Sequence, residues 1–166
     1  VRGKLIFSEL YQAWNDDELA RVRPYVSDSL FNYLRYWLDA YRHEGLANWV
    51  EDYKLSHFAI AKVVRDKHYD AITVRFWASG KDYTVNEKDK VVGGSKRKER
   101  YFSEYWTLIR RAHVRGAARS DKQCPNCGAQ QKVSMAGQCE FCQAHITSGE
   151  FDWILSKIEQ DEAYRG

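Results

Sequence analysis

Two closely spaced pairs of cysteines constrain this chain more than any other feature. All four lie in the stretch CPNCGAQQKVSMAGQCEFC, as Cys124, Cys127, Cys139 and Cys142. Two Cys-x-x-Cys pairs joined by a short loop supply the four thiolates of a tetrahedral zinc site. Gly128 and Gly137 favour the tight turns that such pairs need. The sequence therefore predicts a zinc ribbon.

The role of this predicted site follows from its ligand number. Four thiolates close the coordination sphere of zinc, so we expect a structural ion rather than a catalytic one, in a reducing compartment. Two disulfides are the alternative, and the even Cys-x-x-Cys spacing argues against them. A nucleic-acid-binding ribbon is a further alternative. The loop between the pairs has only Lys132 as a basic residue, and the net charge of the chain is only +3, so both argue against nucleic acid.

The first third of the chain has helical periodicity. In KLIFSELYQAWNDDELARV, which begins at Lys4, apolar residues recur at the three- and four-residue spacing of an amphipathic helix. A second helix is predicted with Ser27 as its N-cap, an apolar stripe from Leu30 to Tyr41 that includes Trp37, and a stop at residue 45, a glycine. A hydrophobic fraction of 44% supplies ample material for a core.

From about residue 53 the pattern changes to strands. Alternating apolar residues predict four of them, at residues 54–64, 70–79, 100–111 and 151–160. The last segment is nearly as compatible with a short helix. Helices followed by a mostly antiparallel sheet indicate an α+β fold.

The order of these segments makes the cysteine stretch an insertion within one fold. We expect residues 1–118 to form the helices and first three strands, 119–148 the inserted zinc ribbon, and 149–166 the last strand. Helices packed across a strongly curved, four-stranded sheet would form a cone with a pocket between the two layers. Such a pocket is a natural site for a ligand or partner.

Longer motifs connect the chain to a known family. They are FSELYQAWNDDELARVRPYVSDSLFNYL, KDYTV with VVGGS, RYFSEYWTLIRR, CPNCGA with GQCEFC, and SGEFDWILSKIEQ. Together these resemble the bacterial Tim44-like domain proteins. Those are similar to the C-terminal domain of the peripheral import-motor anchor of the mitochondrial inner membrane, and more distantly to a mitochondrial ribosomal protein. The resemblance covers nearly the whole chain, although the mitochondrial proteins lack the ribbon.

The resemblance implies both a fold and a role. The fold is a cone similar to nuclear transport factor two, with a large hydrophobic pocket. The role is non-enzymatic anchoring, with peripheral contact to anionic membrane lipids. Because many bacterial members carry a hydrophobic segment before the domain, we expect a tether before Val1. The expected location is the reducing, cytoplasmic face of a bacterial membrane.

Five residues are candidates for lining the pocket: Phe102, Glu104, Trp106, His57 and Phe76. Glu104 lies between two aromatic residues on one face of the third predicted strand, where an unpaired carboxylate is costly. It either pairs with a core arginine or a backbone donor, or it anchors a ligand, or it is a general base with a raised pKa assisted by His57. No trio of Asp, His and Tyr has recognisable catalytic spacing, so we expect no enzyme.

Seven residues are candidates for a membrane or partner surface: Lys96, Arg97, Lys98, Arg110, Arg111, Trp77 and Tyr105. The basic ones lie in the runs KRKER and RRAHVR, which are either solvated loops or attracted to an anionic membrane. Trp77 and Tyr105 are expected to share one face of the sheet with Arg75. That face is either covered by a loop, the ribbon or a second subunit, or it binds a protein.

These observations lead to one functional hypothesis and two alternatives. We expect a non-enzymatic adaptor or anchoring domain that binds a lipid-like or peptide ligand in its pocket. It would dock to a membrane or to a membrane-protein complex, and a homodimer stays open. The first alternative is a small-molecule enzyme that uses Glu104 in the pocket. The second is a zinc-ribbon nucleic-acid binder.

Overall fold

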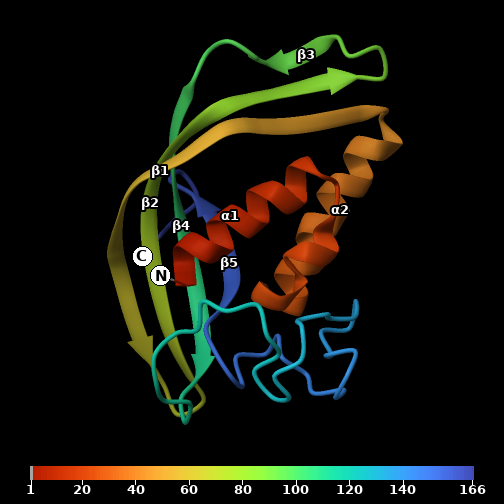
Figure 1. Ribbon diagram of the computed structural model, residues 1–166. Helices are drawn as coiled ribbons and strands as arrows, with labels where there is room; N and C mark the ends of the chain where they lie inside the picture. The colour runs from red at the N-terminus through yellow and green to blue at the C-terminus, as the bar shows by residue number, and fades with distance from the viewer. Residues whose placement is uncertain (1) are drawn as a thin grey trace.

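The computed structural model describes residues 2–166, and Figure 1 shows two helices lying against the concave face of a curved sheet. The helices are α1 (Arg2–Asn15) and α2 (Asp28–His43), with 3-10 turns at Leu19–Arg21 and Arg23–Tyr25 between them. The strands are β1 (Leu46–Arg65), β2 (Tyr69–Asn86), β3 (Val91–Gly94), β4 (Arg100–Arg111) and β5 (Ile154–Gln160). The predicted α+β fold is confirmed, and the last segment is a strand rather than a helix.

The sheet has five strands rather than the four predicted from the sequence. Its order is β1–β2–β4–β5, with every neighbour antiparallel, and β3 pairs with the last part of β2, beyond the stretch that pairs with β4. β3 is only four residues long and two of them are glycines, so it shows no alternating pattern. It forms because β2 extends past β4, and the free backbone groups of β2 need partners.

β1 is longer than predicted and begins at Leu46 rather than at residue 54. The two-residue alternation breaks at Asp52, which has a left-handed φ of 50°. The register against β2 shifts between Glu51 and Lys54 at the same place. A bulge of this kind hides the first part of the strand from a pattern of period two.

α1 is shorter than its periodicity indicates, because the helical pattern continues through Val22 whereas the helix ends at Asn15. The Asn15 side chain bonds with the backbone of Val50 on β1. Its amide donates to the Val50 carbonyl at 2.8 Å, and its oxygen accepts from the Val50 N–H at 2.9 Å. These two bonds hold the end of the helix against the sheet, and Asp17 then turns the chain with a left-handed φ of 57°.

α2 begins and ends where the sequence predicts. The Ser27 hydroxyl accepts from the backbone N–H of Leu30, and Gly45 follows the helix with a left-handed φ of 65°. The buried stripe of α2 is Leu30, Phe31, Leu34 and Leu38. Trp37, which was predicted within that stripe, is 44% exposed, and it lines a cleft together with Leu34.

The core lies between α1 and the concave face of the sheet. Trp106 on β4 is fully buried, and its ring centroid lies 4.5 Å from that of Phe76 on β2 and 5.9 Å from that of Phe7 on α1. Aromatic contacts at these separations contribute about 0.5–1.5 kcal/mol each beyond their burial. They fix how α1 crosses the two central strands.

Between β4 and β5 the chain leaves the sheet for residues 112–153, which carry all four cysteines. Figure 1 shows this excursion as a set of loops at one end of the sheet, close to the N-terminal end of α2. The excursion holds three isolated antiparallel bridges: Gln123 with Gln130, Val133 with Cys139, and Gln138 with His145. The bounds 119–148 for the ribbon stay a prediction.

Candidate functional site

The two cysteine pairs form matching turns. In the first turn the Cys124 N–H donates to the Ala129 carbonyl at 2.8 Å, and the residue-128 N–H donates back to the Cys124 carbonyl at 2.9 Å. The second turn repeats this pattern with Cys139, Ala144 and Gln143, at 2.9 Å for both bonds. The fifth residue of each turn has a left-handed φ, 75° at Gly128 and 64° at Gln143. The sequence identified the first of these positions but missed Gln143, because it is not a glycine.

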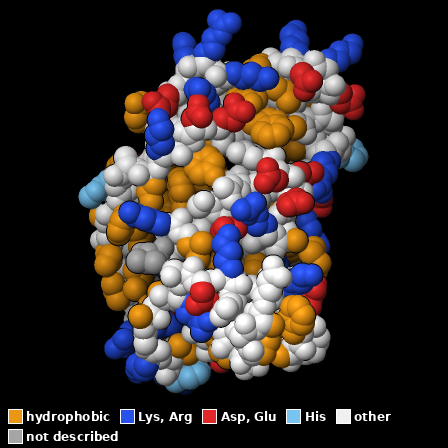
Figure 2. All heavy atoms as spheres, viewed as in Figure 1, with side chains coloured by type: hydrophobic (Ala, Val, Ile, Leu, Met, Phe, Trp, Pro, Cys, Tyr) orange, Lys and Arg blue, Asp and Glu red, His pale blue; other side chains and the backbone are white. Residues whose placement is uncertain are grey.

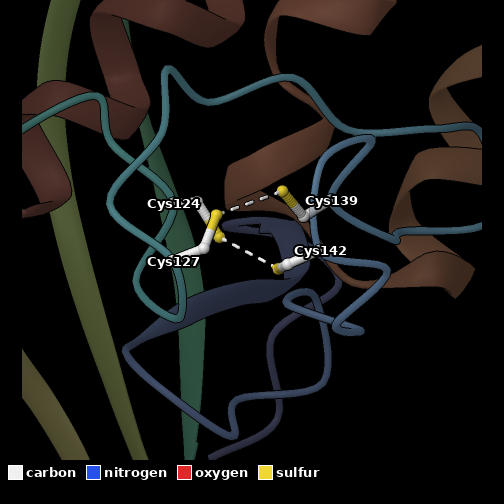
Figure 3. A group of neighbouring side chains, drawn as sticks. All are labelled: Cys124, Cys127, Cys139 and Cys142. Carbon is white, nitrogen blue, oxygen red and sulfur yellow. Dashed lines mark hydrogen bonds between the residues drawn. The ribbon is translucent and has the colours of Figure 1, made fainter.

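The four sulfur atoms converge on one point, as Figure 3 shows. All four Sγ atoms lie within 4.8 Å of one another, with Cys124 and Cys142 at 3.9 Å and Cys127 and Cys139 at 4.0 Å. A disulfide needs about 2.05 Å, and all four cysteines are free. Tetrahedral bonds of about 2.3 Å would place the sulfurs roughly 3.8 Å apart. The cluster therefore fits a four-thiolate metal site.

The surroundings of the cluster suit metal binding. Cys124 and Cys139 are buried against Ile146, so half of the ligand set is shielded from solvent. The side-chain amide of Asn126 donates to Cys142 Sγ at 3.4 Å and lowers the pKa of the Cys142 thiol to about 6. At Cys127 a backbone hydrogen bond lowers the pKa, but burial and the other three thiols outweigh it and raise the pKa to about 11. Cys142, with its lowered pKa, is largely thiolate at neutral pH, and the thiolate is the form that binds metal.

A buried arginine fastens the cysteine loops to the helices. The Arg23 side chain is 1% exposed, and its Nε donates to the Met135 carbonyl at 3.0 Å. Its Nη2 pairs with Asp28 at the start of α2, and Asp28 also accepts from the Thr147 hydroxyl at 2.9 Å. A Cβ on Gly137 would lie 2.1 Å from Thr147 Oγ1, so this glycine allows the loop to approach Arg23. The sequence assigned Gly137 to a turn before Cys139. Its N–H donates to the Ser134 carbonyl at 2.9 Å and its φ is left-handed at 82°, so it serves both this turn and the close packing.

α1 makes a second connection to the same loops through Glu9. Lys122 Nζ donates to Glu9 Oε1 at 2.6 Å, and Arg21 Nε donates to Glu9 Oε2 at 2.9 Å. Burial of this carboxylate would by itself raise its pKa, but the bonds from Lys122 and Arg21 outweigh burial and lower the pKa of Glu9. A third connection runs from Arg2, which donates to the Arg119 carbonyl and pairs with Asp152 at 3.5 Å.

An apolar cavity of about 220 Å³ lies beneath the start of α1. Its lining comes from α1, β1, β2, β4 and the excursion: Arg2, Gly3, Lys4, Leu55, Phe58, Ile72, Val74, Phe76, Leu108, Ala118 and Trp153. Of the five residues predicted for the pocket, only Phe76 lines this cavity. Phe58 was missed, although its place in the apolar alternation of β1 was the signal for it.

The structure does not bring the other predicted pocket residues to this cavity. Trp106 is sealed in the core, and Phe102 and Glu104 together line a different cleft near the opposite end of the sheet. His57 is exposed and lies against Trp77, with ring centroids 5.2 Å apart. It is therefore separated from Glu104, because bulges in β1 turn His57 to the face that carries Trp77.

Glu104 is bonded to neutral donors. The Trp106 indole N–H donates to its Oε2 at 2.9 Å, and the Gln160 side-chain amide donates to its Oε1 at 2.7 Å. Within residues 2–166 no lysine, arginine or histidine lies within 4.0 Å of this carboxylate. Neither the core arginine nor the backbone donor considered from the sequence is its partner.

The aromatic face of the sheet is built around Arg75. Its guanidinium lies 4.7 Å from the Trp77 ring centroid and 5.3 Å from that of Tyr105. The C-terminal residues cover part of this face. Asp161 pairs with Arg75 at 2.9 Å, and Tyr164 stacks on Tyr105 at 3.8 Å. The cover therefore comes from the end of the same chain.

The two basic runs lie far apart in the fold. Lys96, Arg97 and Lys98 are exposed on the loop before β4, and Figure 2 shows basic side chains projecting at the end of the molecule where β3 lies. Arg110 and Arg111 lie at the other end of β4. Arg110 packs over the Trp153 ring at 4.6 Å, and Arg111 pairs with Glu150 at 3.0 Å. Among the described residues, neither helix combines the length and apolar character needed to span a membrane.

Comparison with known proteins identifies one family. The Tim44-like domain matches residues 3–121, which include all of α1 except Arg2, together with α2 and strands β1 to β4. The match ends before Cys124, so the cysteine cluster lies outside it. No curated protein matches the chain. Because the match covers more than half of the residues, this chain belongs to the Tim44-like domain family.

Proposed function

We propose that this chain is a non-enzymatic adaptor or anchoring domain of a membrane-associated protein, and that it holds a lipid-like chain in the cavity beneath α1. Membership of the Tim44-like domain family suggests a membrane-associated adaptor. The curved sheet covered by two helices supports a cone similar to nuclear transport factor two. The observation that carries the proposal is the chemistry of the cavity itself.

The cavity has an apolar wall and a cationic rim. Lys4 lies at the rim, with its Nζ 5.9 Å from the Phe58 ring centroid, and it has no carboxylate partner within residues 2–166. Arg2 also lines the cavity, whereas no acidic side chain does. An amphiphile with an apolar chain and an anionic headgroup matches this arrangement.

The size of the cavity restricts the ligand further. Sites for drug-sized molecules are about 300–1,000 Å³, and this cavity is about 220 Å³. It therefore suits one extended acyl chain, or one apolar side chain of a peptide, better than a compact ring system.

The position of Glu104 supports an adaptor rather than an enzyme. A general base needs a free lone pair within reach of a substrate proton. Each oxygen of Glu104 accepts one hydrogen bond from a neutral donor and keeps a further lone pair, but His57, the residue expected to assist it, lies on the other face of the sheet. The histidine expected to act as the second acid–base group is therefore separated from Glu104.

We propose zinc as the metal of the cysteine cluster. Four thiolates with sulfur separations near 4 Å suit tetrahedral zinc and leave no open position for a substrate, so the ion would be structural. Thiolate ligands also favour a reducing location, such as the cytoplasmic face of a bacterial membrane.

A fatty-acid binding assay tests the cavity. A fluorescent fatty acid should bind the wild-type protein, and Lys4→Glu should weaken binding about tenfold, since a favourable charge is replaced by a repulsive one. Lys62→Glu, a matched exposed change on β1, should leave binding unchanged. Equal binding of the fatty acid and its uncharged methyl ester would refute the cationic rim.

Vesicle sedimentation tests contact with the membrane. A basic residue near an anionic bilayer contributes about 1 kcal/mol. The pair Lys96→Ala and Lys98→Ala should therefore weaken binding to vesicles with 30% anionic lipid roughly thirtyfold. Lys62→Ala with Lys67→Ala is the control with the same change in charge. Equal binding to neutral and acidic vesicles would contradict this part of the proposal.

A further inference from the structure

A second hollow lies at the other end of the helical layer, where α1 ends. Two adjoining clefts, of about 430 and 500 Å³, share Tyr11, Val50, Glu104 and Gln160 in their lining. We call the two together the acidic cleft. Their walls come from α1, α2, the first part of β1, the last part of β2, the start of β4, the end of β5 and the residues that follow β5.

One wall of the acidic cleft is aromatic. Tyr33 and Trp37 on α2 are 55% and 44% exposed, and their rings meet edge to face at 6.3 Å. Trp14 on α1 lies beside them, with its indole N–H donating to Asn48 at 3.0 Å. Large aromatic side chains that stay exposed beside a hollow are typical of a binding surface.

The floor of the acidic cleft carries negative charge. Four acidic side chains and one arginine line it: Asp82, Glu104, Glu159, Glu162 and Arg100. Arg100 pairs with Asp82 at 2.9 Å, and Glu159 pairs with Lys157 at 2.7 Å. Glu104 lies at the junction of the two clefts and is bonded to neutral donors only, as described above. The cavity beneath α1 has the opposite character, with two cations and no acid.

We propose that the acidic cleft binds a lysine or arginine side chain from an extended segment of a partner protein. The cationic group would approach Glu104, and the methylene carbons would pack against Trp37 and Tyr33. Charge-assisted bonds and cation–π contacts both strengthen when water is excluded. Figure 2 shows acidic and hydrophobic side chains together in the upper part of the molecule, the combination that such a segment requires.

The charge of the cleft excludes other occupants of similar shape. An uncharged apolar segment would cover Glu104 without supplying a cation, which costs the desolvation energy of the carboxylate. An anionic lipid headgroup would be repelled by the four acidic side chains of the cleft. A basic side chain is the occupant that both the aromatic wall and the acidic floor favour.

Two blocked peptides test this inference, acetyl-Ala-Leu-Arg-Leu-Ala-amide and the same peptide with norleucine in place of arginine. Binding is followed by NMR of the tryptophan indole N–H groups in the metal-loaded protein. The arginine peptide should shift the Trp106 signal, because that N–H donates to Glu104, and should also shift the Trp37 signal. The norleucine peptide should bind at least tenfold more weakly.

Variants then separate the contribution of the acidic floor from that of the aromatic wall. Glu104→Gln should weaken binding of the arginine peptide at least tenfold, and Trp37→Ala should weaken it about threefold. Glu140→Gln, on an exposed loop of the cysteine excursion, is the matched control and should bind like the wild type. The spread of the remaining indole signals reports whether each variant is folded.

Two outcomes would overturn the inference: equal binding of the two peptides, or full affinity in Glu104→Gln. Either result is independent of the fatty-acid assay, because Lys4 and Glu104 line different hollows. A failure here therefore leaves the lipid proposal standing, and the reverse also holds.

Discussion

At the residue scale, Glu9 shows how one carboxylate joins distant parts of the chain. It is 5% exposed and binds Arg21 next to α1 and Lys122 beside the first cysteine. The pKa of the Glu9 carboxyl is lower in the folded protein than in the unfolded chain. The resulting stabilisation is fully present above the unfolded value of about 4.3 and is lost as the pH falls through the folded value.

Glu9→Gln should therefore lower the free energy of unfolding by about 2 kcal/mol at pH 7. The difference from wild type should shrink as the pH falls below about 4.3, because Glu9 is then protonated in the unfolded chain, and it should vanish once the folded carboxyl is protonated as well. Urea denaturation between pH 3 and pH 7 measures this. Glu18→Gln, an exposed neighbour, is the control. A loss that is equal at pH 3 and pH 7 would show that packing, not charge, is responsible.

Cys139→Ser should remove the metal from the excursion. Its sulfur is fully buried and lies 4.0 Å from that of Cys127, so a serine leaves an incomplete ligand set. Elemental analysis should find one zinc per chain in the wild type and less than a tenth of that in the variant. Met135→Leu in the same loop should keep its zinc. A wild-type protein purified with zinc present but containing none would contradict the metal assignment.

At the scale of elements, two glycines distinguish the effect of close packing from the effect of backbone strain. Gly137 and Gly116 both have left-handed φ values, 82° and 100°. A Cβ at Gly137 would lie 2.1 Å from Thr147 Oγ1 and 2.8 Å from Arg23 Nη2, whereas at Gly116 nothing lies within 4 Å. At Gly137 a side chain is disfavoured both by neighbouring atoms and by the backbone dihedral angle. At Gly116 it is disfavoured by the dihedral angle alone.

Gly137→Ala should cost about 3 kcal/mol of unfolding free energy, and Gly116→Ala about 1 kcal/mol. The difference reflects displacement of Arg23 and Thr147, which tie the cysteine loops to α2. Thermal unfolding of both variants with bound metal measures it. Equal losses would mean that the loop adapts freely and that its packing against Arg23 contributes little.

Most helices and strands were predictable, and the exceptions share a physical cause. The bounds of α2 follow from Ser27 and Gly45, whose roles are local. The end of α1 at Asn15 depends on Val50, and the four residues of β3 depend on the overhang of β2. Partners distant in sequence decide these ends, so periodicity within one segment does not predict them.

At the scale of the whole molecule, the cysteine excursion is coupled to the helical layer. Arg2 and Glu9 on α1, and Arg23 shortly before α2, each form a hydrogen bond with a residue of the excursion. The β1–β2 hairpin is held by a long antiparallel ladder. Loss of the metal should therefore loosen α1 while leaving the hairpin unchanged.

Hydrogen exchange with and without a zinc chelator measures this coupling. Amides of residues 2–12 and 119–148 should exchange at least tenfold faster after metal removal, and amides of residues 54–79 should keep their protection. Zinc added back should restore the original rates. Faster exchange confined to residues 119–148 would show that the excursion is an independent unit.

The sequence by itself determined the features that depend on short-range chemistry. The Cys-x-x-Cys spacing places two sulfurs on one turn, so the clustering of the four cysteines was predictable without coordinates. The α+β order and the family followed from patterns along the chain, and both are confirmed. Each of these is encoded within a few neighbouring residues or in their order.

Only the tertiary structure decided where the hollows lie and what charge each carries. Phe76 and Glu104 were expected in one pocket, yet they line different hollows, because α1 crosses the sheet between the two ends. Lys4 faces the cavity and Trp37 faces the acidic cleft through the docking of the helices. The sum of many long-range contacts sets that docking, and no local pattern contains it.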